Sequence, residues 1–180
     1  GVRLVGSEMC IRDSCNVITV DDDVLYPRTF AQQLIDAPSA TTITAYRAHR
    51  VVLDEDGIAP YKKWKPVRSA EPSILHFATG VDGVRYPKEM VRYVAERGTE
   101  FLDLAPRADD VWLNHCALRA GFPVKQVSER SANFPLVPGS QRVRLSRVNL
   151  SGGNDVQIAA TYSAEDVAKL RGAEERLSGE

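Results

Sequence analysis

A short run of β-branched residues that ends in consecutive carboxylates is the feature that most constrains the fold of this chain. The run Asn16–Val20 has the apolar composition of a buried strand in an α/β sheet, and the triplet Asp21–Asp23 follows it directly. Open α/β sheets bind their ligands at the carboxyl ends of their strands. Adjacent carboxylates repel one another, so the sequence predicts a cation at this acidic corner. A divalent metal is the simplest candidate, because hard cations prefer carboxylate oxygen.

A helix is predicted directly after the acidic corner. Pro27 suits the first turn of a helix, where the N–H group that it lacks would have no partner in any case. The apolar residues at positions 30, 31, 34 and 35 fall on one helical face. The strand and the helix together place the acids on a rigid scaffold. The alternative interpretation is a solvated acidic turn that binds no ligand.

The first residues are left out of the fold prediction. Residues 1–14 contain the stretch Ser7–Ser14, which resembles a translated sequencing adapter, and we interpret residues 1–14 as a non-native leader. Charged residues interrupt this stretch, so it lacks the apolar core of a signal peptide. On this interpretation the native sequence begins near Cys15, and we expect upstream strands of the complete protein to be missing.

Composition indicates one globular domain. The chain has 180 residues, of which 43% are hydrophobic and 26% are charged, as in ordinary globular proteins. Its net charge of -1 gives no electrostatic case for binding nucleic acid, which favours a clustered basic surface. The sequence has no apolar run of about 18 residues, so no transmembrane segment is expected. The cysteines show no metal-ligand spacing, and a reducing, cytoplasmic setting is the default.

Alternating apolar patterns continue along the rest of the chain. Strands are predicted over residues 41–46, continuing toward 51–53, and over residues 73–78, with a loop over residues 60–72. Tyr86–Pro87 resembles the earlier helix entry at Tyr26–Pro27. The segment Ser163–Asp166 has the pattern of a helix cap, and the final helix is predicted to reach about Leu177.

A second acidic corner precedes the central helix of the chain. Asp109 and Asp110 stand immediately before apolar residues at positions 111, 113, 117 and 118, which follow a helical pattern. Acids at this place suit the partial positive charge of a helix N-terminus, and capping is the plainer interpretation. A pair of adjacent carboxylates can also supply a general base, because each raises the pKa of the other.

Segments spread over residues 16–162 together resemble bacterial GT-A type glycosyltransferases of the broad family 2 kind. The acidic corner followed by Tyr26–Pro27 resembles the family's Asp-x-Asp strand end, and residues 79–87 resemble its glycine-containing acceptor segment. Residues 108–112 resemble the acidic pair that carries the catalytic base, and Asn149 with residues 154–157 resembles a polar segment near the end of the domain. Asp82 stands where the family pattern has glycine.

The resemblance implies a partial GT-A fold, which is a Rossmann-like α/β architecture with a mostly parallel central sheet flanked by helices. Residues 15–162 would form the C-terminal part of the glycosyltransferase domain, and residues 163–180 a C-terminal helix or tail. The implied activity is metal-dependent transfer of a sugar, with inversion, in the synthesis of surface glycans. The implied location is cytoplasmic, either free or peripherally associated with the inner face of the membrane.

The resemblance also assigns roles to single residues. Asp21 and Asp23 are expected to bind Mn²⁺ or Mg²⁺, with Asp21 and Asp22 at the nucleotide of a nucleotide-sugar donor. Asp110, with Asp109 beside it, is expected to take the proton from the hydroxyl of a saccharide or glycolipid acceptor. The residues expected on the acceptor side are Gly80, Gly83 and Trp112.

Other interpretations of these residues stay open. The glycines equally suit a tight turn. Trp112, and Tyr61 with Trp64 in the loop, equally suit packing in a core. The whole pattern also fits another metal-dependent phosphoryl or nucleotidyl transferase, or a non-catalytic α/β binding domain in which both acidic corners are structural.

Overall fold

The computed structural model describes residues 15–36, 40–138 and 153–179, and these form a mixed α/β fold. The strands are β1 (Val17–Thr19), β2 (Ile43–Ala45), β3 (Ala48–Arg50), β4 (Leu53–Asp54), β5 (Gly57–Ile58), β6 (Lys65–Pro66), β7 (His76–Ala78), β8 (Val84–Tyr86) and β9 (Val124–Gln126). The helices are α2 (Phe30–Ile35), the short 3₁₀ turn η1 (Tyr61–Lys63), α3 (Lys88–Glu96), α4 (Phe101–Leu104), α5 (Asp109–Ala120), α7 (Asn154–Thr161) and α8 (Ala164–Ser178).

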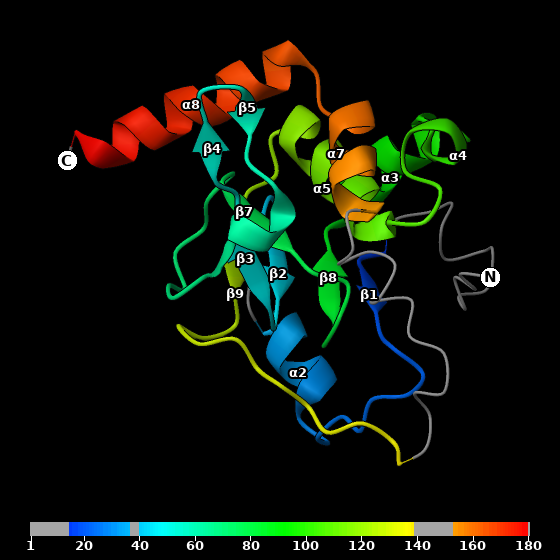
Figure 1. Ribbon diagram of the computed structural model, residues 1–180. Coiled ribbons are helices and arrows are strands. Elements are labelled where there is room, and N and C mark those ends of the chain that lie inside the picture. Colours follow the sequence, from blue (N-terminus) through cyan, green and yellow to red (C-terminus); the bar gives the residue numbers. More distant parts are fainter. Residues whose placement is uncertain (1–14, 37–39, 139–152, 180) are drawn as a thin grey trace.

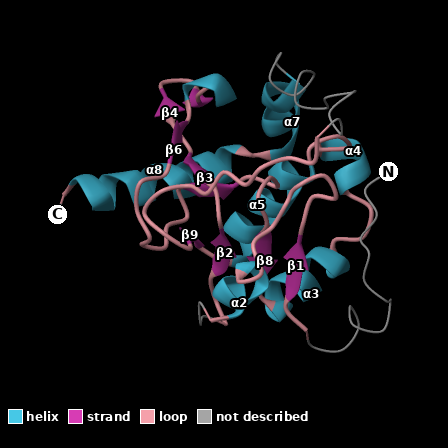
Figure 2. Ribbon diagram, turned by 90° about the horizontal axis from the view of Figure 1, so that it is seen from below, coloured by secondary structure: helices cyan, strands magenta, loops and turns pink. Residues whose placement is uncertain are grey.

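The central sheet is mostly antiparallel. Figure 2 shows its strands side by side in the order β1-β8-β2-β9. Strand β8 pairs antiparallel with both β1 and β2, and of the described pairs in this sheet β2 with β9 alone is parallel. The expected mostly parallel sheet is therefore not confirmed. Short apolar runs of this kind look the same in a sequence whichever way their neighbours run, so the pattern could not supply the direction of β8.

A second, three-stranded sheet has the order β6-β3-β7, and β4 with β5 forms a separate hairpin. The chain leaves the central sheet at Tyr46 and enters the second sheet at Ala48, so the segment predicted as one continuing strand is two strands in two sheets. The N–H group of Tyr46 donates to the carbonyl oxygen of Gly83 at 3.2 Å, which holds this crossing against the start of β8.

Helix α5 lies at the centre of the packing. It contacts α3, α4, α7 and β7, and these helices gather at one end of the molecule (Figure 1). Its buried residues include Val111, Trp112 and Cys116, and the helix ends at Gly121, which has a left-handed φ of 78°. Glycine adopts this conformation without the steric cost that a side chain would bring. The predicted central helix is therefore confirmed, and little of its surface reaches solvent.

The strand that carries the first acidic corner is less buried than its composition predicts. Every residue of β1 is half-buried, and β1 stands at an edge of the sheet among the described strands. At the opposite end of the molecule from α5 (Figure 1), helix α2 buries Phe30 and Leu34 in a separate cluster with Tyr46. The ring of Phe134 packs against this cluster, 5.1 Å from the ring of Tyr46.

The C-terminal helix begins where the sequence predicts it. Ser163 and Asp166 form a reciprocal capping box at the start of α8. The side chain of Arg119 on α5 reaches the carboxylate of Asp166 at 2.6 Å, and Leu170 is buried in the main core. Helix α8 is therefore packed against the domain in the described residues, along its upper edge in Figure 1.

Gly83→Ala is expected to destabilise the fold strongly. Gly83 has a φ of 95°, and a Cβ atom added there would lie 2.4 Å from Cζ of Phe30. The substitution therefore combines an unfavourable backbone conformation with a clash in the α2 cluster, and we expect the free energy of unfolding to fall by about 3 kcal/mol. Thermal or urea denaturation followed by circular dichroism measures this loss.

Gly80→Ala is the matched control for that experiment. A Cβ atom added at Gly80 meets nothing within 4 Å, and its φ lies outside the left-handed region. We expect the free energy of unfolding to change by less than about 0.5 kcal/mol. Equal losses in the two variants would contradict the packing role of Gly83.

Candidate functional site

The first acidic corner follows the end of β1 as predicted. Asp21 and Asp23 are half-buried, whereas Asp22 between them is exposed. The backbone N–H of Asp21 donates to the hydroxyl oxygen of Tyr26 at 2.9 Å, which closes the turn. Burial raises the pKa of Tyr26 to about 12, so this hydroxyl stays neutral at physiological pH. The alternation of burial supports Asp21 and Asp23 as the outer acids of an Asp-x-Asp pattern.

Asp21 sits among like charges. Burial raises the pKa of its carboxyl, and the charges of Asp23, Asp82 and Asp109 raise it further. A hydrogen bond from the backbone N–H of Asp82 to Oδ2 of Asp21, at 3.3 Å, acts in the opposite direction. Negative charges held together in this way favour a bound cation, because the cation relieves their mutual repulsion.

The second acidic corner opens helix α5. Oδ1 of Asp110 accepts a hydrogen bond from the backbone N–H of Val111 at 2.9 Å, and Oδ1 of Asp109 accepts one from the N–H of Asp110 at 3.0 Å. Each carboxylate therefore accepts the N–H group of the next residue, but the N-cap of α5 is Ala108 and no side chain caps the helix. Asp110 is suited to more than these hydrogen bonds, because its pKa is far from its ordinary value.

The pKa of Asp110 is raised from 3.8 to about 7. Burial is the main cause, and the negative charge of Asp109 adds to it. Hydrogen bonds from backbone N–H groups, including those of Val111 and Gly80, lower the pKa but do not offset the burial. A carboxyl with a pKa near the working pH is suited to accept a proton as a general base.

Asn114 holds Asp110 in place, and the sequence analysis did not single it out. The side chain of Asn114 accepts the N–H of Ala78 at 2.9 Å and donates to the carbonyl oxygen of Ala78 at 2.8 Å. It also donates to the backbone carbonyl of Asp110 at 2.8 Å, one turn earlier in α5. These bonds fasten the start of α5 to the end of β7. A polar residue four positions after an acid in an apolar helix was the signal that could have identified it.

The connection over residues 79–83, between β7 and β8, joins the two acidic corners. The backbone N–H of Gly80 faces the carboxyl of Asp110 and lowers its pKa, and the backbone N–H of Asp82 donates to Oδ2 of Asp21 at 3.3 Å. Thr79 fixes the start of this connection, since its N–H donates to the carbonyl oxygen of Arg47 at 3.2 Å. Two amides of one short segment, two residues apart, therefore each face one of the two acidic corners.

The corners are close enough to influence each other electrostatically. The charge of Asp109 raises the pKa of Asp21, although the two residues are far apart in the sequence. Burial raises the pKa of Tyr86 on β8, and the charges of Asp109 and Asp110 raise it further. Tyr86 is therefore close to the second corner as well. The acids that the sequence placed in two separate motifs therefore belong to one region of the fold.

The predicted acceptor-side residues occupy different environments. Trp112 is 4% exposed and packs 5.8 Å from the ring of His115, under the guanidinium of Arg97. It lies in the core, so this geometry gives no support to its predicted role as a platform for a sugar. Gly83 is required by the packing of Phe30, as described above. Gly80 is, among the described residues, the one predicted acceptor-side residue whose N–H group faces an acid, the carboxyl of Asp110.

Tyr61 is less buried than Trp112. It is half-buried at the start of η1, and its backbone N–H donates to Oδ1 of Asp155 at 2.7 Å. Burial raises the pKa of Tyr61 to about 12, and the negative charge of Asp110 adds to the effect. Trp64, by contrast, is 5% exposed and donates its ring N–H to the carbonyl oxygen of Ala59.

The polar segment near the end of the domain supports the second corner. Oε1 of Gln157 accepts the backbone N–H of Arg107 at 2.8 Å, just before the acidic pair, and its amide donates to the carbonyl oxygen of Gly153. Asn154 is buried, with no hydrogen-bond partner for its Oδ1 among the described residues. Asn149, which the sequence analysis grouped with this segment, lies outside the described residues.

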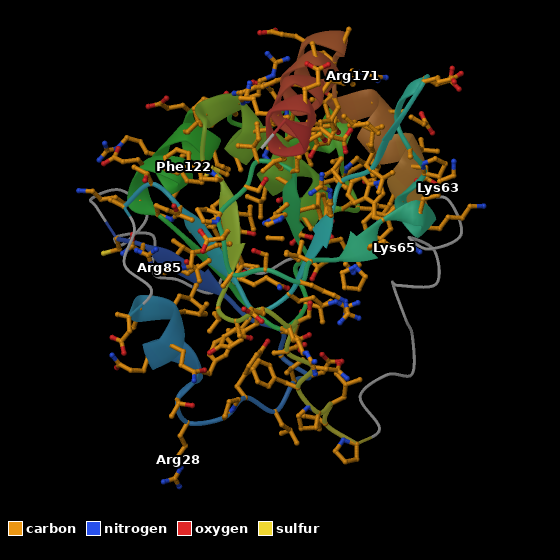
Figure 3. All side chains as sticks on the ribbon, turned by 90° about the vertical axis from the view of Figure 1, so that its left-hand side faces the viewer. Arg28, Lys63, Lys65, Arg85, Phe122 and Arg171 are labelled. Carbon is orange, nitrogen blue, oxygen red and sulfur yellow. The ribbon has the colours of Figure 1, made fainter. Side chains whose placement is uncertain are left out.

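The basic residues of the predicted loop are exposed. Lys62, Lys63, Lys65 and Arg68 are all exposed, which suits a solvated loop face. Figure 3 shows Lys63 and Lys65 projecting outward on the same side of the molecule, and Arg28 pointing away from it at the far end. Lys63 lies 3.7 Å from the carboxylate of Asp54, so part of this basic charge is locally balanced.

The acids fit a metal that is shared with a substrate. In the described part of the chain, no group of three or more His, Cys, Asp or Glu side chains comes together to hold a metal ion. Mg²⁺ in enzymes of phosphate chemistry is commonly held by one or two carboxylates, with substrate phosphates and water completing its shell. Asp21 and Asp23 supply two such carboxylates, and Oδ2 of Asp82 is a buried acidic oxygen without a hydrogen-bond partner in the described residues.

Comparisons with models of protein families, with curated proteins and with solved structures found no match for this chain. Within residues 15–36, 40–138 and 153–179, no helix has the length and apolar character needed to cross a membrane.

Proposed function

We propose that this chain belongs to a metal-dependent glycosyltransferase of GT-A type, which moves a sugar from a nucleotide-diphosphate donor to an acceptor hydroxyl. The observation that carries the proposal is that both acidic corners adjoin one connection: the N–H group of Asp82 donates to Oδ2 of Asp21, and Asn114 fastens Asp110 to Ala78, where that connection begins. A transferase of this kind needs a cation at the leaving group and a base at the acceptor, on either side of one sugar. The two corners supply these two functions.

Asp21 and Asp23 would hold the cation. Departure of the nucleoside diphosphate leaves negative charge on phosphate, and a bound Mn²⁺ or Mg²⁺ stabilises that charge. Asp21 is oriented for this task by the N–H group of Asp82, and its carboxyl is crowded by other acids. Asp22 is exposed and stands outside this pair, where it can reach the nucleotide.

Asp110 would take the proton of the acceptor hydroxyl. Its pKa of about 7 leaves a substantial fraction ionised at neutral pH, and the same value makes it a stronger base than an ordinary carboxylate. Asn114 and Gly80 fix it from two directions. When Asp110 takes its proton, the acceptor oxygen attacks the sugar from the face opposite the leaving nucleoside diphosphate, which gives inversion at the sugar. The half-buried ring of Tyr61 offers a surface for the acceptor nearby.

The wider setting belongs to the same proposal. The central sheet would be a partial GT-A sheet, and the acceptor a saccharide or glycolipid in the synthesis of surface glycans. The work would be done in the cytoplasm, free or at the inner face of the membrane. The proposal rests on the two acidic corners and on the resemblance of their motifs. The other two interpretations, a phosphoryl or nucleotidyl transferase and a non-catalytic binding domain, predict different products.

Release of free nucleoside diphosphate is the expected result when the protein meets its donor. The chain is incubated with Mn²⁺, a mixed saccharide acceptor and each of UDP-glucose, UDP-galactose, UDP-N-acetylglucosamine and GDP-mannose, and the nucleotide products are separated by chromatography. Sugar transfer yields the nucleoside diphosphate, and chelation by EDTA abolishes it.

A different product would point to a different enzyme. An enzyme that transfers the sugar phosphate yields a nucleoside monophosphate from the same donors, and a nucleotidyl transferase yields the sugar 1-phosphate. The non-catalytic interpretation predicts no metal-dependent product from any donor. Either outcome would replace the glycosyltransferase proposal.

A further inference from the structure

Asp82 has the most unusual backbone and side chain in the described residues. Its φ of 70° makes it the one non-glycine residue there in the left-handed region. Its side chain is 1% exposed, and Oδ2 has no hydrogen-bond partner in the described part of the chain. A buried acidic oxygen left in this state costs stability, and residues strained in this way cluster at functional sites.

The backbone alone does not explain the choice of aspartate. Glycine adopts this φ without steric cost, and the neighbouring Gly83 does so at 95°. The N–H group that Asp82 donates to Asp21 would also be present in glycine. What aspartate adds is therefore its carboxylate.

The carboxylate of Asp82 has one structural contact. Its Oδ1 accepts the backbone N–H of Phe134 at 3.1 Å. The segment that follows runs beside the acidic corner, where the N–H of Leu25 donates to the carbonyl oxygen of Pro135 and the N–H of Val137 donates to that of Asp23, each at 2.8 Å. Oδ1 thus ties this segment to the corner, while the buried Oδ2 has no hydrogen-bond partner in the described residues.

Asp82 is in direct contact with the first acidic corner, because its N–H group donates to Oδ2 of Asp21 at 3.3 Å. The positive charge of Arg47 balances the charge of Asp82 in part. Burial without full neutralisation leaves a carboxylate that a cation would stabilise.

We propose that Asp82 is a positioning residue for a divalent cation held by Asp21 and Asp23, with its Oδ2 atom supplying negative charge to the cation's outer shell. This inference rests on the proposed function, because it concerns the metal that the function requires. Outer-shell carboxylates orient metal ligands and raise metal affinity, so the unused oxygen acquires a role when the cation is present.

The test is the binding of Mn²⁺ alone to the full chain, measured by the electron paramagnetic resonance signal of free Mn²⁺. Asp82→Asn keeps the size of the side chain and its acceptor for Phe134, and asparagine tolerates the left-handed conformation. Asp82→Gly removes the carboxylate and relieves the backbone strain. Each is expected to raise the dissociation constant for Mn²⁺ by about 10- to 100-fold.

Asp56→Asn is the matched control, because Asp56 is an exposed acid in the β4–β5 turn. Its Mn²⁺ dissociation constant is expected to equal that of the unaltered chain. Melting temperatures of all variants are measured in parallel, and binding is measured well below them, so that a purely structural role lowers the melting temperature without changing the dissociation constant. The two Asp82 variants differ in strain, so agreement between their dissociation constants assigns the effect to the lost charge.

Unchanged Mn²⁺ affinity in Asp82→Asn, or in Asp82→Gly if Asp82→Asn does not fold, would overturn the inference. Absence of Mn²⁺ binding by the unaltered chain would overturn it together with the metal site. If the chain binds Mn²⁺ and the affinity depends on Asp82, but no sugar is transferred, the inference stands and the proposed function fails. The two proposals are therefore separated by one pair of measurements.

Discussion

Asp110→Asn is expected to lower kcat by about 10²- to 10⁴-fold while the affinity for the nucleotide-sugar donor stays the same. Asparagine keeps the shape of the side chain and its acceptor for the N–H of Val111, but it cannot take a proton. In the unaltered chain kcat/KM should rise with pH through the pKa of Asp110, near 7, and then level off. Steady-state kinetics with a saturating acceptor between pH 5 and pH 9 give both quantities.

The same substitution separates a base from a helix cap by its effect on stability. The pKa of Asp110 is higher in the folded chain, about 7, than its ordinary 3.8, so the folded state keeps a proton that the unfolded state loses. Ionisation of Asp110 therefore destabilises the fold as the pH rises from about 4 to about 7. Since asparagine does not ionise, the variant should be more stable than the unaltered chain at pH 8, by about 1–3 kcal/mol, and equal to it near pH 4.

Asp109→Asn is the matched variant for this pair. It removes the charge that helps to raise the pKa of Asp110. The midpoint of the pH profile should therefore move to lower pH, with a loss of kcat of less than about tenfold. A lowered melting temperature at pH 8 in Asp110→Asn, with kcat little changed, would instead establish the carboxylate as a cap.

Asp23→Ala is expected to abolish metal-dependent transfer. The side chain is lost as a ligand, whereas the backbone carbonyl that accepts the N–H of Val137 remains, so the fold around the corner should survive. A cation that keeps one carboxylate of two binds far more weakly, and the charge on the leaving diphosphate is then left without its partner. The initial rate of nucleoside diphosphate release, followed as Mn²⁺ is increased, measures the loss.

Asp22→Ala tests which acids form the pair. Asp22 is exposed between two half-buried neighbours, so its removal should lower the rate by less than about tenfold and leave the dependence on Mn²⁺ unchanged. If Asp22→Ala loses activity as completely as Asp23→Ala, Asp22 is itself one of the residues that hold the metal. Full activity in Asp23→Ala would remove the metal assignment altogether.

Local signals were the part of this fold that the sequence could predict. The helix from Asp109 and the cap at Ser163 were recoverable because each depends on residues within one or two turns. The strand before Asp21 was recoverable for the same reason, since β-branched residues mark it. Its half-burial at the sheet edge was not, because burial depends on which strands come to lie beside it.

Contacts between distant segments could not be predicted from the sequence. The antiparallel direction of β8 follows from how the chain crosses between two sheets, and no residue of β8 encodes it. The resemblance placed Trp112 on the acceptor side because it stands beside the acidic pair, but α5 is covered on several sides and Trp112 is 4% exposed. The roles of Asn114 and of the left-handed Asp82 depend on partners more than thirty residues away.

The connection over residues 79–83 also bears on how this protein can change in length. Loops that connect strands usually accept inserted or deleted residues readily. Here the N–H groups of Gly80 and Asp82 face opposite corners, and one residue separates them. Adding or removing a residue would turn one of these amides away from its carboxylate, so homologues that keep both corners should conserve the length of this connection even where its residues differ.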